Sequence, residues 1–196
     1  GDIVNATGYW GTAHATPATC VTTSSTTSAT CNGDGDGTIN ESTGSNEPFR
    51  YWQHLANAGL IEGTYTGVTG SGTTYSATYG TNTPAGRISS SGWMAYYYGT
   101  VAVTSTQVFE GNYDNVLVYG GTNTSSFGGN VANASEMWGI DTKIDDGKPG
   151  IGGLRTYEAS STCHDAGTSA ASSLAGTANY NLTSSTIACP FIFVLR

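Results

Sequence analysis

The stretch Asn32-Gly33-Asp34-Gly35-Asp36-Gly37-Thr38-Ile39 alternates oxygen-bearing side chains with glycine, and a helix-like stretch follows at 47–58. Hard cations such as Ca²⁺ bind about six to eight oxygens, so oxygen ligands at every second position of a tight loop suit them. Glycines between these ligands let the backbone curl around an ion without a clash at Cβ. The stretch therefore predicts a cation-binding loop, with a solvated Gly/Asp turn as the alternative.

The predicted ligands follow from aligning the stretch with an EF-hand-type loop that starts at Asn32. The first, third, fifth and seventh positions supply ligands in such a loop. The twelfth position, a glutamate in that motif, is Thr43 in this sequence, so another glutamate is expected to complete the shell. The predicted ligands of a structural Ca²⁺ are Asn32, Asp34, Asp36, the Thr38 carbonyl, and Glu41 or Glu47.

Length and charge limit the class of protein. A chain of 196 residues is expected to form one domain, residues 1–196, with a sizeable core. Only 10% of its residues are charged, and six basic against fourteen acidic residues give a net charge of −8. Nucleic acids and anionic membrane surfaces attract basic proteins, so this balance argues against both as partners.

The four cysteines fall into two sequence-local couples, Cys20 with Cys31 and Cys163 with Cys189. Neither couple has the Cys-x-x-Cys spacing of a zinc or redox site. Four cysteines allow three connectivities, and we favour the local pairing because each bridge would then hold together one loop-rich stretch. Disulfides favour an oxidising compartment, so we expect an exported, cell-surface protein that has lost an upstream segment.

Apolar periodicity and turn residues predict two helices. The first covers about 46–58, with Ser45 or Asn46 as its cap and Gly59 at its end. The second covers 133–145 and opens with Asn133 and Glu136, the spacing of a capping box. Its predicted apolar stripe consists of Met137, Ile140 and Ile144.

Runs rich in aromatic and β-branched residues predict four strands, at 87–91, 93–103, 115–119 and 191–195. Successive strand residues point to opposite faces, so the run Tyr96-Tyr97-Tyr98 indicates ordinary sheet packing rather than one flat aromatic platform.

Several blocks of the sequence resemble one protein family. They are GDIVNATGYWG at 1–11, the loop at 32–37, FRYWQHLANAGLIEG at 49–63, IDTKIDDGKP at 140–149, and the cysteine shortly before the final strand. Together they resemble the globular head of prepilin-type proteins, the type IV pilins and type II secretion pseudopilins of bacteria. The matches spread over nearly the whole chain, and the blocks at 49–63 and 140–149 are fairly specific.

The resemblance implies a fold and a set of partners. The implied fold is α+β, a pilin-like head with an antiparallel sheet, short helices and loop-rich, disulfide-stapled regions, in which a structural Ca²⁺ is common. The long apolar N-terminal helix of the family is missing from this sequence. The head is therefore expected to be truncated, or to assemble with a helix-bearing partner chain. The implied partners are other pilin-like subunits, with contact to a membrane only through that helix.

The expected function is that of a non-catalytic structural subunit, major or minor, of an extracellular bacterial filament. The alternative is a secreted adhesin or carbohydrate-binding module that stacks sugars on exposed aromatic side chains. An enzyme is disfavoured because neither a Gly-x-Ser-x-Gly elbow nor a His-Glu-x-x-His motif occurs. The three histidines, His14, His54 and His164, lie far apart in the sequence, and His54 is expected to be a packing residue. A carboxylate pair for glycoside hydrolysis stays open.

Overall fold

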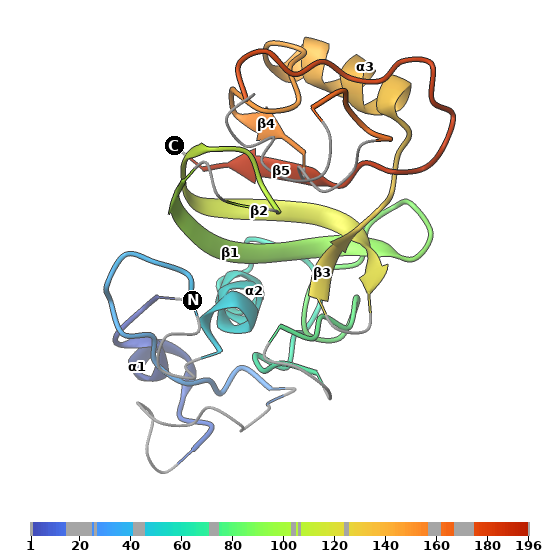
Figure 1. Cartoon of the computed structure of the whole chain (residues 1–196). Helices are drawn as coiled ribbons and strands as arrows, with labels where there is room; N and C mark the ends of the chain where they lie inside the picture. Colours follow the sequence, from blue (N-terminus) through green and yellow to red (C-terminus); the bar gives the residue numbers. More distant parts are fainter. Residues whose placement is uncertain are drawn as a thin grey trace. The chain divides into compact units, whose positions relative to one another are not determined.

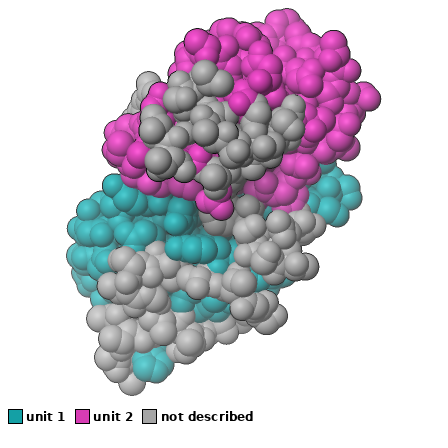
Figure 2. All heavy atoms as spheres, viewed as in Figure 1, with its two compact units in different colours: residues 1–97, 122–127 teal, residues 98–121, 128–196 magenta. Residues whose placement is uncertain are grey.

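The computed structural model describes residues 2–14, 25, 27–40, 46–70, 75–102, 105, 107–123, 126–156, 162–166 and 175–195. Two compact units divide the chain (Figure 2): unit 1 is Gly1–Tyr97 with Thr122–Phe127, and unit 2 is Tyr98–Gly121 with Gly128–Arg196. The assignment of residues 1–196 to one domain stays a prediction.

The described residues form helices and strands in a mixed order along the chain (Figure 1). They are α1 (Ala6–Trp10), α2 (Glu47–Asn57), β1 (Ser91–Val101), β2 (Gly111–Asn123), β3 (Ser126–Gly129), α3 (Ala134–Ile144), β4 (Leu154–Arg155) and β5 (Phe191–Val194). In the part of the chain that the structure describes, no helix combines the length and apolar character needed to cross a membrane.

The strands form a five-stranded sheet in the order β1-β2-β5-β4, with β3 paired to β2. Strand β5 runs antiparallel to both of its neighbours, with Val118 opposite Ile192 and Leu154 opposite Phe193. Burial on both sides explains the continuous apolar run of β5, because Phe191 and Ile192 point to opposite faces and are both buried. The predicted α+β class with an antiparallel sheet is confirmed.

The predicted strands differ from the observed ones mainly at their ends. Strand β1 begins at Ser91, and the strand predicted at 87–91 is wrong because residues 87–90 form a bend and turn in which Ser90 has φ 57°. Strand β2 is longer than its predicted core at 115–119. Within β2, Asp114 has φ 46°, which interrupts the regular alternation of the strand. Tyr113 and Val116, three residues apart, would point to opposite faces of a regular strand, and both are buried.

Helix α3 lies in unit 2 and begins as the sequence predicts. The Asn133 side chain accepts a hydrogen bond from the Glu136 N–H at 2.9 Å, and the Glu136 carboxylate accepts one from the Asn133 N–H at 2.9 Å. The helix packs against β4, above the sheet in Figure 1. Its buried positions are Ala134, Met137 and Asp141, whereas Ile144 is exposed, so the predicted stripe is wrong at its C-terminal end.

Helix α2 lies in unit 1 and buries Phe49 and Trp52, which are three residues apart and so share one face. Asn46 precedes its first turn, but the Asn46 side chain does not cap the helix. It accepts a hydrogen bond from the Thr69 N–H at 2.9 Å, and Asn46 itself has a left-handed backbone with φ 56°. Asn46 therefore ties the following loop to the helix start, and Gly59 ends the helix at φ 70°, as predicted.

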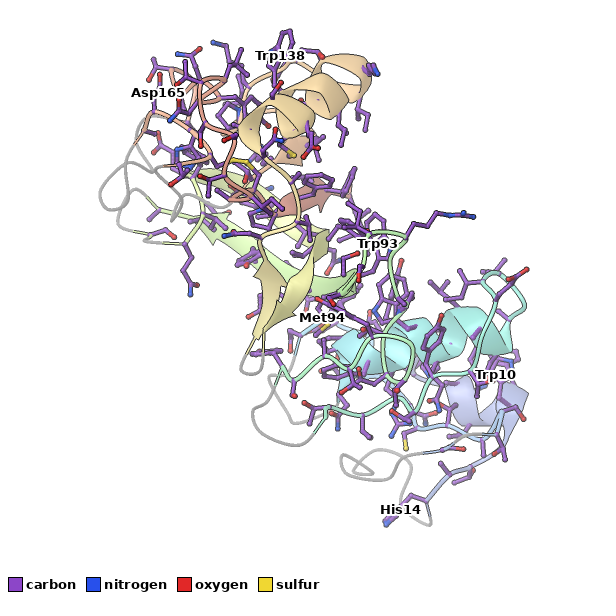
Figure 3. All side chains as sticks on the ribbon, turned by 90° about the vertical axis from the view of Figure 1, so that its right-hand side faces the viewer. Trp10, His14, Trp93, Met94, Trp138 and Asp165 are labelled. Atoms are coloured by element: carbon purple, nitrogen blue, oxygen red, sulfur yellow. A yellow bond between two sulfur atoms is a disulfide. The ribbon has the colours of Figure 1, made fainter. Side chains whose placement is uncertain are left out.

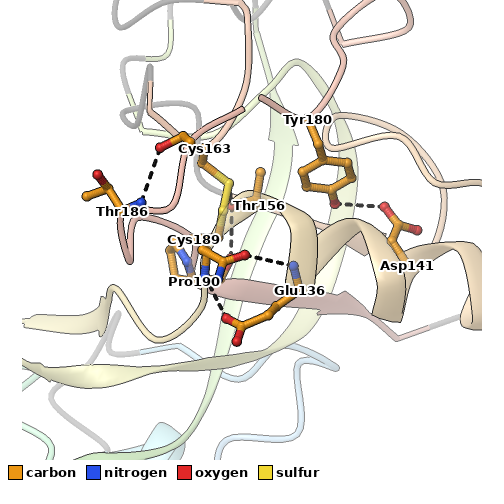
Figure 4. The surroundings of a disulfide bond; sticks show 10 residues. Glu136, Asp141, Thr156, Cys163, Tyr180, Thr186, Cys189 and Pro190 are labelled. Carbon is orange, nitrogen blue, oxygen red and sulfur yellow. Dashed lines mark hydrogen bonds between the residues drawn. A yellow bond between two sulfur atoms is a disulfide. The ribbon is translucent and has the colours of Figure 1, made fainter. Parts of the chain in front are cut away.

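The second cysteine couple is bonded as predicted. Cys163 and Cys189 form a disulfide in unit 2 with a Cα–Cα distance of 5.3 Å, and Cys189 immediately precedes the chain that leads into β5 (Figure 4). The Thr156 hydroxyl, next to this bridge, donates to the Pro190 carbonyl at 2.9 Å. Cys31 is also disulfide-bonded, and its predicted partner Cys20 lies outside the described residues.

The capping box of α3 gives the first prediction. Asn133→Ala removes the acceptor for the Glu136 N–H, and a lost N-cap of this kind costs about 1 kcal/mol. Urea unfolding should show that loss, whereas the matched control Ser135→Ala, at an exposed position of the same turn, should change stability by less than about 0.5 kcal/mol. Equal effects of the two substitutions would contradict a stabilising role of the cap.

Candidate functional site

Four acidic side chains of unit 1 converge on one place. Asp2, Asp34, Asp36 and Glu47 each present a carboxylate oxygen, and these oxygens all lie within 4.8 Å of one another. Three of the four are ligands that the sequence predicts. The sequence did not predict Asp2, which lies before α1 and about thirty residues before the loop.

The backbone of the loop holds the Asp2 carboxylate. Its two oxygens accept hydrogen bonds from the Gly35 N–H at 2.6 Å and the Gly37 N–H at 2.8 Å. Both glycines have positive φ, at 77° and 86°, where a residue with Cβ is strained. A Cβ on Gly35 would also collide with the Val4 side chain. The glycines of the motif thus let two alternate amides, those of Gly35 and Gly37, donate to a single carboxylate.

Glu47, the first residue of α2, supplies the buried member of the cluster. Its side chain is 0% exposed, and its oxygens accept from the Asp34 N–H at 3.0 Å and the Asn40 N–H at 3.4 Å. Burial raises the pKa of Glu47 above its ordinary value. The helix start and the loop are therefore joined through one desolvated carboxylate, whose charged form needs further stabilisation.

The other predicted ligands have diverse environments. The Asn32 side chain accepts from the Thr7 N–H in α1 at 3.0 Å. The Thr38 hydroxyl and N–H both donate to Asp36, at 2.6 and 2.7 Å, and these bonds lower the pKa of Asp36. The Asn40 amide in turn donates to the Thr38 hydroxyl. Glu41 lies outside the described residues, so Glu47 is the glutamate that the structure brings to the cluster.

The arrangement can hold a hard cation. Four carboxylates whose oxygens lie this close repel one another, although solvent screens the exposed Asp34 and Asp36. A divalent cation among them replaces repulsion by attraction. Oxygen-only donors suit Ca²⁺ or Mg²⁺ rather than a softer metal.

A second acidic group lies in unit 2, where Asp141, Asp145 and Asp146 present oxygens within 4.8 Å. Backbone amides from the following turn occupy these carboxylates. Asp145 accepts from the N–H groups of Gly153 and Leu154, and Asp146 accepts from the Lys148 N–H at 2.8 Å. These bonds fasten the turn after α3 to the start of β4.

The three histidines lie in different surroundings. His54 is buried and lies beside the Trp10 ring, with 5.2 Å between ring centroids. Its Nε2 is 3.2 Å from the Cys31 carbonyl, and burial lowers its pKa to about 3. His54 is thus a neutral packing residue, as predicted. His164 is fully buried in unit 2 beside Phe109, and His14 is exposed in unit 1.

Comparison of the chain with protein families, with curated proteins and with solved structures finds no match.

The buried pair Asp141 and Tyr180 gives a pH-dependent prediction. The Tyr180 hydroxyl donates to Asp141 at 2.7 Å (Figure 4), and burial raises the pKa of Asp141 from 3.8 to about 6. Because the folded state holds this proton more tightly than the unfolded chain, Asp141 lowers stability as the pH rises from about 4 to about 6.

Above that range the Tyr180 hydroxyl bonds to a charged carboxylate, a bond that contributes roughly 1.5–3 kcal/mol. Tyr180→Phe should therefore destabilise the protein more at pH 8 than at pH 5, as measured by chemical unfolding. Tyr9→Phe, at a position 72% exposed, is the control and should have little effect at either pH. A loss for Tyr180→Phe that is the same at both values would contradict this account of the pair.

Proposed function

We propose that the chain is a non-catalytic structural subunit of an extracellular bacterial filament, a pilin-like head stabilised by Ca²⁺ in unit 1. The observation that carries the proposal is the convergence of Asp2, Asp34, Asp36 and Glu47 on one place. In this proposal the cation fixes the loop and the start of α2, and it has no part in a reaction.

The chemistry of the donor set supports Ca²⁺ in particular. Ca²⁺ accepts about six to eight oxygens in irregular geometry, whereas Mg²⁺ requires a near-octahedral shell and keeps several waters. The donors of the cluster come from three separate segments, the N-terminal segment, the loop and α2, which favours the more tolerant ion. In the proposal, Asp2, Asp34, Asp36 and Glu47 provide the carboxylate ligands, and the Asn32 amide oxygen and Thr38 carbonyl complete the shell.

Two features support the filament role. The blocks that resemble pilin-type heads include α2 with the chain after it, and the C-terminal part of α3 with the turn that leads to β4. The Cys163–Cys189 disulfide immediately before β5 corresponds to the disulfide-stapled C-terminal region of such heads and favours an exported protein. Other pilin-like subunits are the proposed partners.

Calcium should raise the thermal stability of the protein. A cation that binds only the folded state stabilises it by RT ln(1 + [L]/Kd), about 2.7 kcal/mol at a hundredfold excess over Kd. We expect a higher melting temperature in millimolar CaCl₂ than in chelator, and a smaller increase in Asp34→Asn and Asp36→Asn. Asp114→Asn is the matched control, because Asp114 lies in unit 2 and asparagine tolerates its positive φ.

The same variants can also contradict the calcium site. A melting temperature that calcium leaves unchanged, or that rises equally in Asp34→Asn, Asp36→Asn and Asp114→Asn, would remove the calcium site from the proposal. Isothermal titration with CaCl₂ measures the same binding without unfolding the protein.

The filament role needs a separate experiment on the protein in its own cells. Gold-labelled antibodies raised against this chain should decorate fibres on the cell surface along their length. Label found on the cells or in the medium but never on fibres would contradict a filament subunit and favour the secreted module. Antibodies against an unrelated exported protein serve as the control for fibre staining.

A further inference from the structure

We propose that a depression on unit 2, formed by the end of α3, the turn after it and the segment around Asn179, binds a neutral saccharide. The depression has a volume of about 270 Å³, and its lining includes Trp138, Asp146, Lys148, Asn179 and Leu182. Every lining residue belongs to unit 2. The proposed calcium cluster lies in unit 1, so this inference does not depend on it.

Trp138 supplies the apolar wall of the depression. The side chain is 43% exposed on α3, and its indole ring offers a broad flat face together with an N–H donor (Figure 3). Among the described residues, none accepts a hydrogen bond from that N–H. A pyranose ring presents C–H groups on one face and hydroxyls around its edge, so an aromatic face beside a free donor fits it.

A glycine keeps the edge of the indole open. Gly147 has φ 72°, and a Cβ at this position would lie 3.5 Å from the Trp138 indole nitrogen. It would also collide with the Thr142 methyl group at 2.7 Å. Any larger side chain at position 147 would therefore cover the donor, whereas glycine leaves space beside it for a ligand.

Polar groups held by hydrogen bonds line the same depression as the indole. The Lys148 ammonium donates to the Asn179 side-chain oxygen at 2.6 Å, and the Asn179 amide donates to Asp165 at 3.1 Å. The Asn179 N–H also donates to Asp165, at 2.7 Å, so the segment is held at both backbone and side chain. Trp138 and Asp165 lie at the same end of unit 2 in Figure 3.

These groups can bond to the hydroxyls of a sugar. Lys148 has two further N–H donors, and Asp146 has an oxygen that accepts no hydrogen bond from the described residues, so both can bond to hydroxyls. Lys148 and Asp146 are the charged residues of the lining. The carboxylates of Asp141 and Asp145 lie within 4.8 Å of that of Asp146, so the depression repels anions, but these two carboxylates accept hydrogen bonds from Tyr180 and from the amides of Gly153 and Leu154. Few polar groups converging beside an apolar wall are typical of small-ligand sites, and we infer an uncharged ligand with many hydroxyls.

Titration of the whole chain with neutral oligosaccharides tests the proposal. A neutral glycan array, followed by calorimetry with cellotetraose, chitotetraose and maltotetraose in chelator-containing buffer, should give saturable binding to at least one probe. Trp138→Ala should weaken that binding tenfold or more, a loss of about 1.4 kcal/mol. Asp146→Ala should also weaken it. Tyr9→Ala, which removes an exposed aromatic side chain of unit 1, is the matched control and should leave affinity unchanged.

Near-ultraviolet circular dichroism establishes that each variant is folded, and Trp138→Phe provides a conservative replacement with intermediate expected affinity. No saturable binding to any neutral glycan would overturn the proposal. So would binding that Trp138→Ala leaves intact in a folded protein, because the ligand would then occupy another surface.

Discussion

The buried carboxylate of Glu47 is the constraint on which the arrangement of unit 1 depends. It stands at the first position of α2, fully inaccessible to solvent, and it accepts amide hydrogen bonds from Asp34 and Asn40 at the two ends of the acidic loop. A charged group removed from water costs several kcal/mol unless hydrogen bonds and opposite charge compensate it. The two amides give part of that compensation, and in the proposed function a bound cation adds to it.

The loop around the Glu47 carboxylate also directs its backbone amides at acidic side chains. The amides of Gly35 and Gly37 face Asp2, while those of Asp36 and Thr38 face the preceding acidic side chains. Each carboxylate is thereby oriented by the backbone before any ion binds. Such pre-organisation reduces the entropy that a ligand must remove on binding.

Unit 2 also contains a helix with a buried carboxylate, but the partners of that carboxylate differ. Its helix α3 also buries one carboxylate, Asp141, but a tyrosine hydroxyl and the Gly147 N–H meet it, and its neighbours accept amides of the turn before β4. The partners of Asp141 are thus protein groups, and its pKa is raised because burial outweighs them. In both units an acidic residue on a short helix accepts hydrogen bonds from the neighbouring turn or loop and so fastens it to the helix.

The features that depend on residues close together in the sequence were predictable from it. The capping box of Asn133 and the alternating loop were predictable because each lies within a few residues of chain. The bend at Ser90 was not predicted, because a run of β-branched and polar residues does not show that one serine will adopt a positive φ. The side-chain role of Asn46 was not predicted either, because its partner Thr69 lies far along the sequence. Asp2 escaped prediction for the same reason.

Two further features show where sequence reasoning ends. The loop spacing could not choose between Glu41 and Glu47, because that choice depends on where α2 begins relative to the loop. The depression beside Trp138 carried no sequence signal either, because its lining comes from segments some forty residues apart that meet only in the folded unit.

A high-resolution crystal structure of the protein grown in CaCl₂ tests the central claim most directly. The account predicts one strong peak among Asp2, Asp34, Asp36 and Glu47, with oxygens at about 2.3–2.6 Å, the range for Ca²⁺. A site that holds only water at hydrogen-bond distances of about 2.7–3.0 Å, with the same carboxylates bonded to the loop amides, would contradict it.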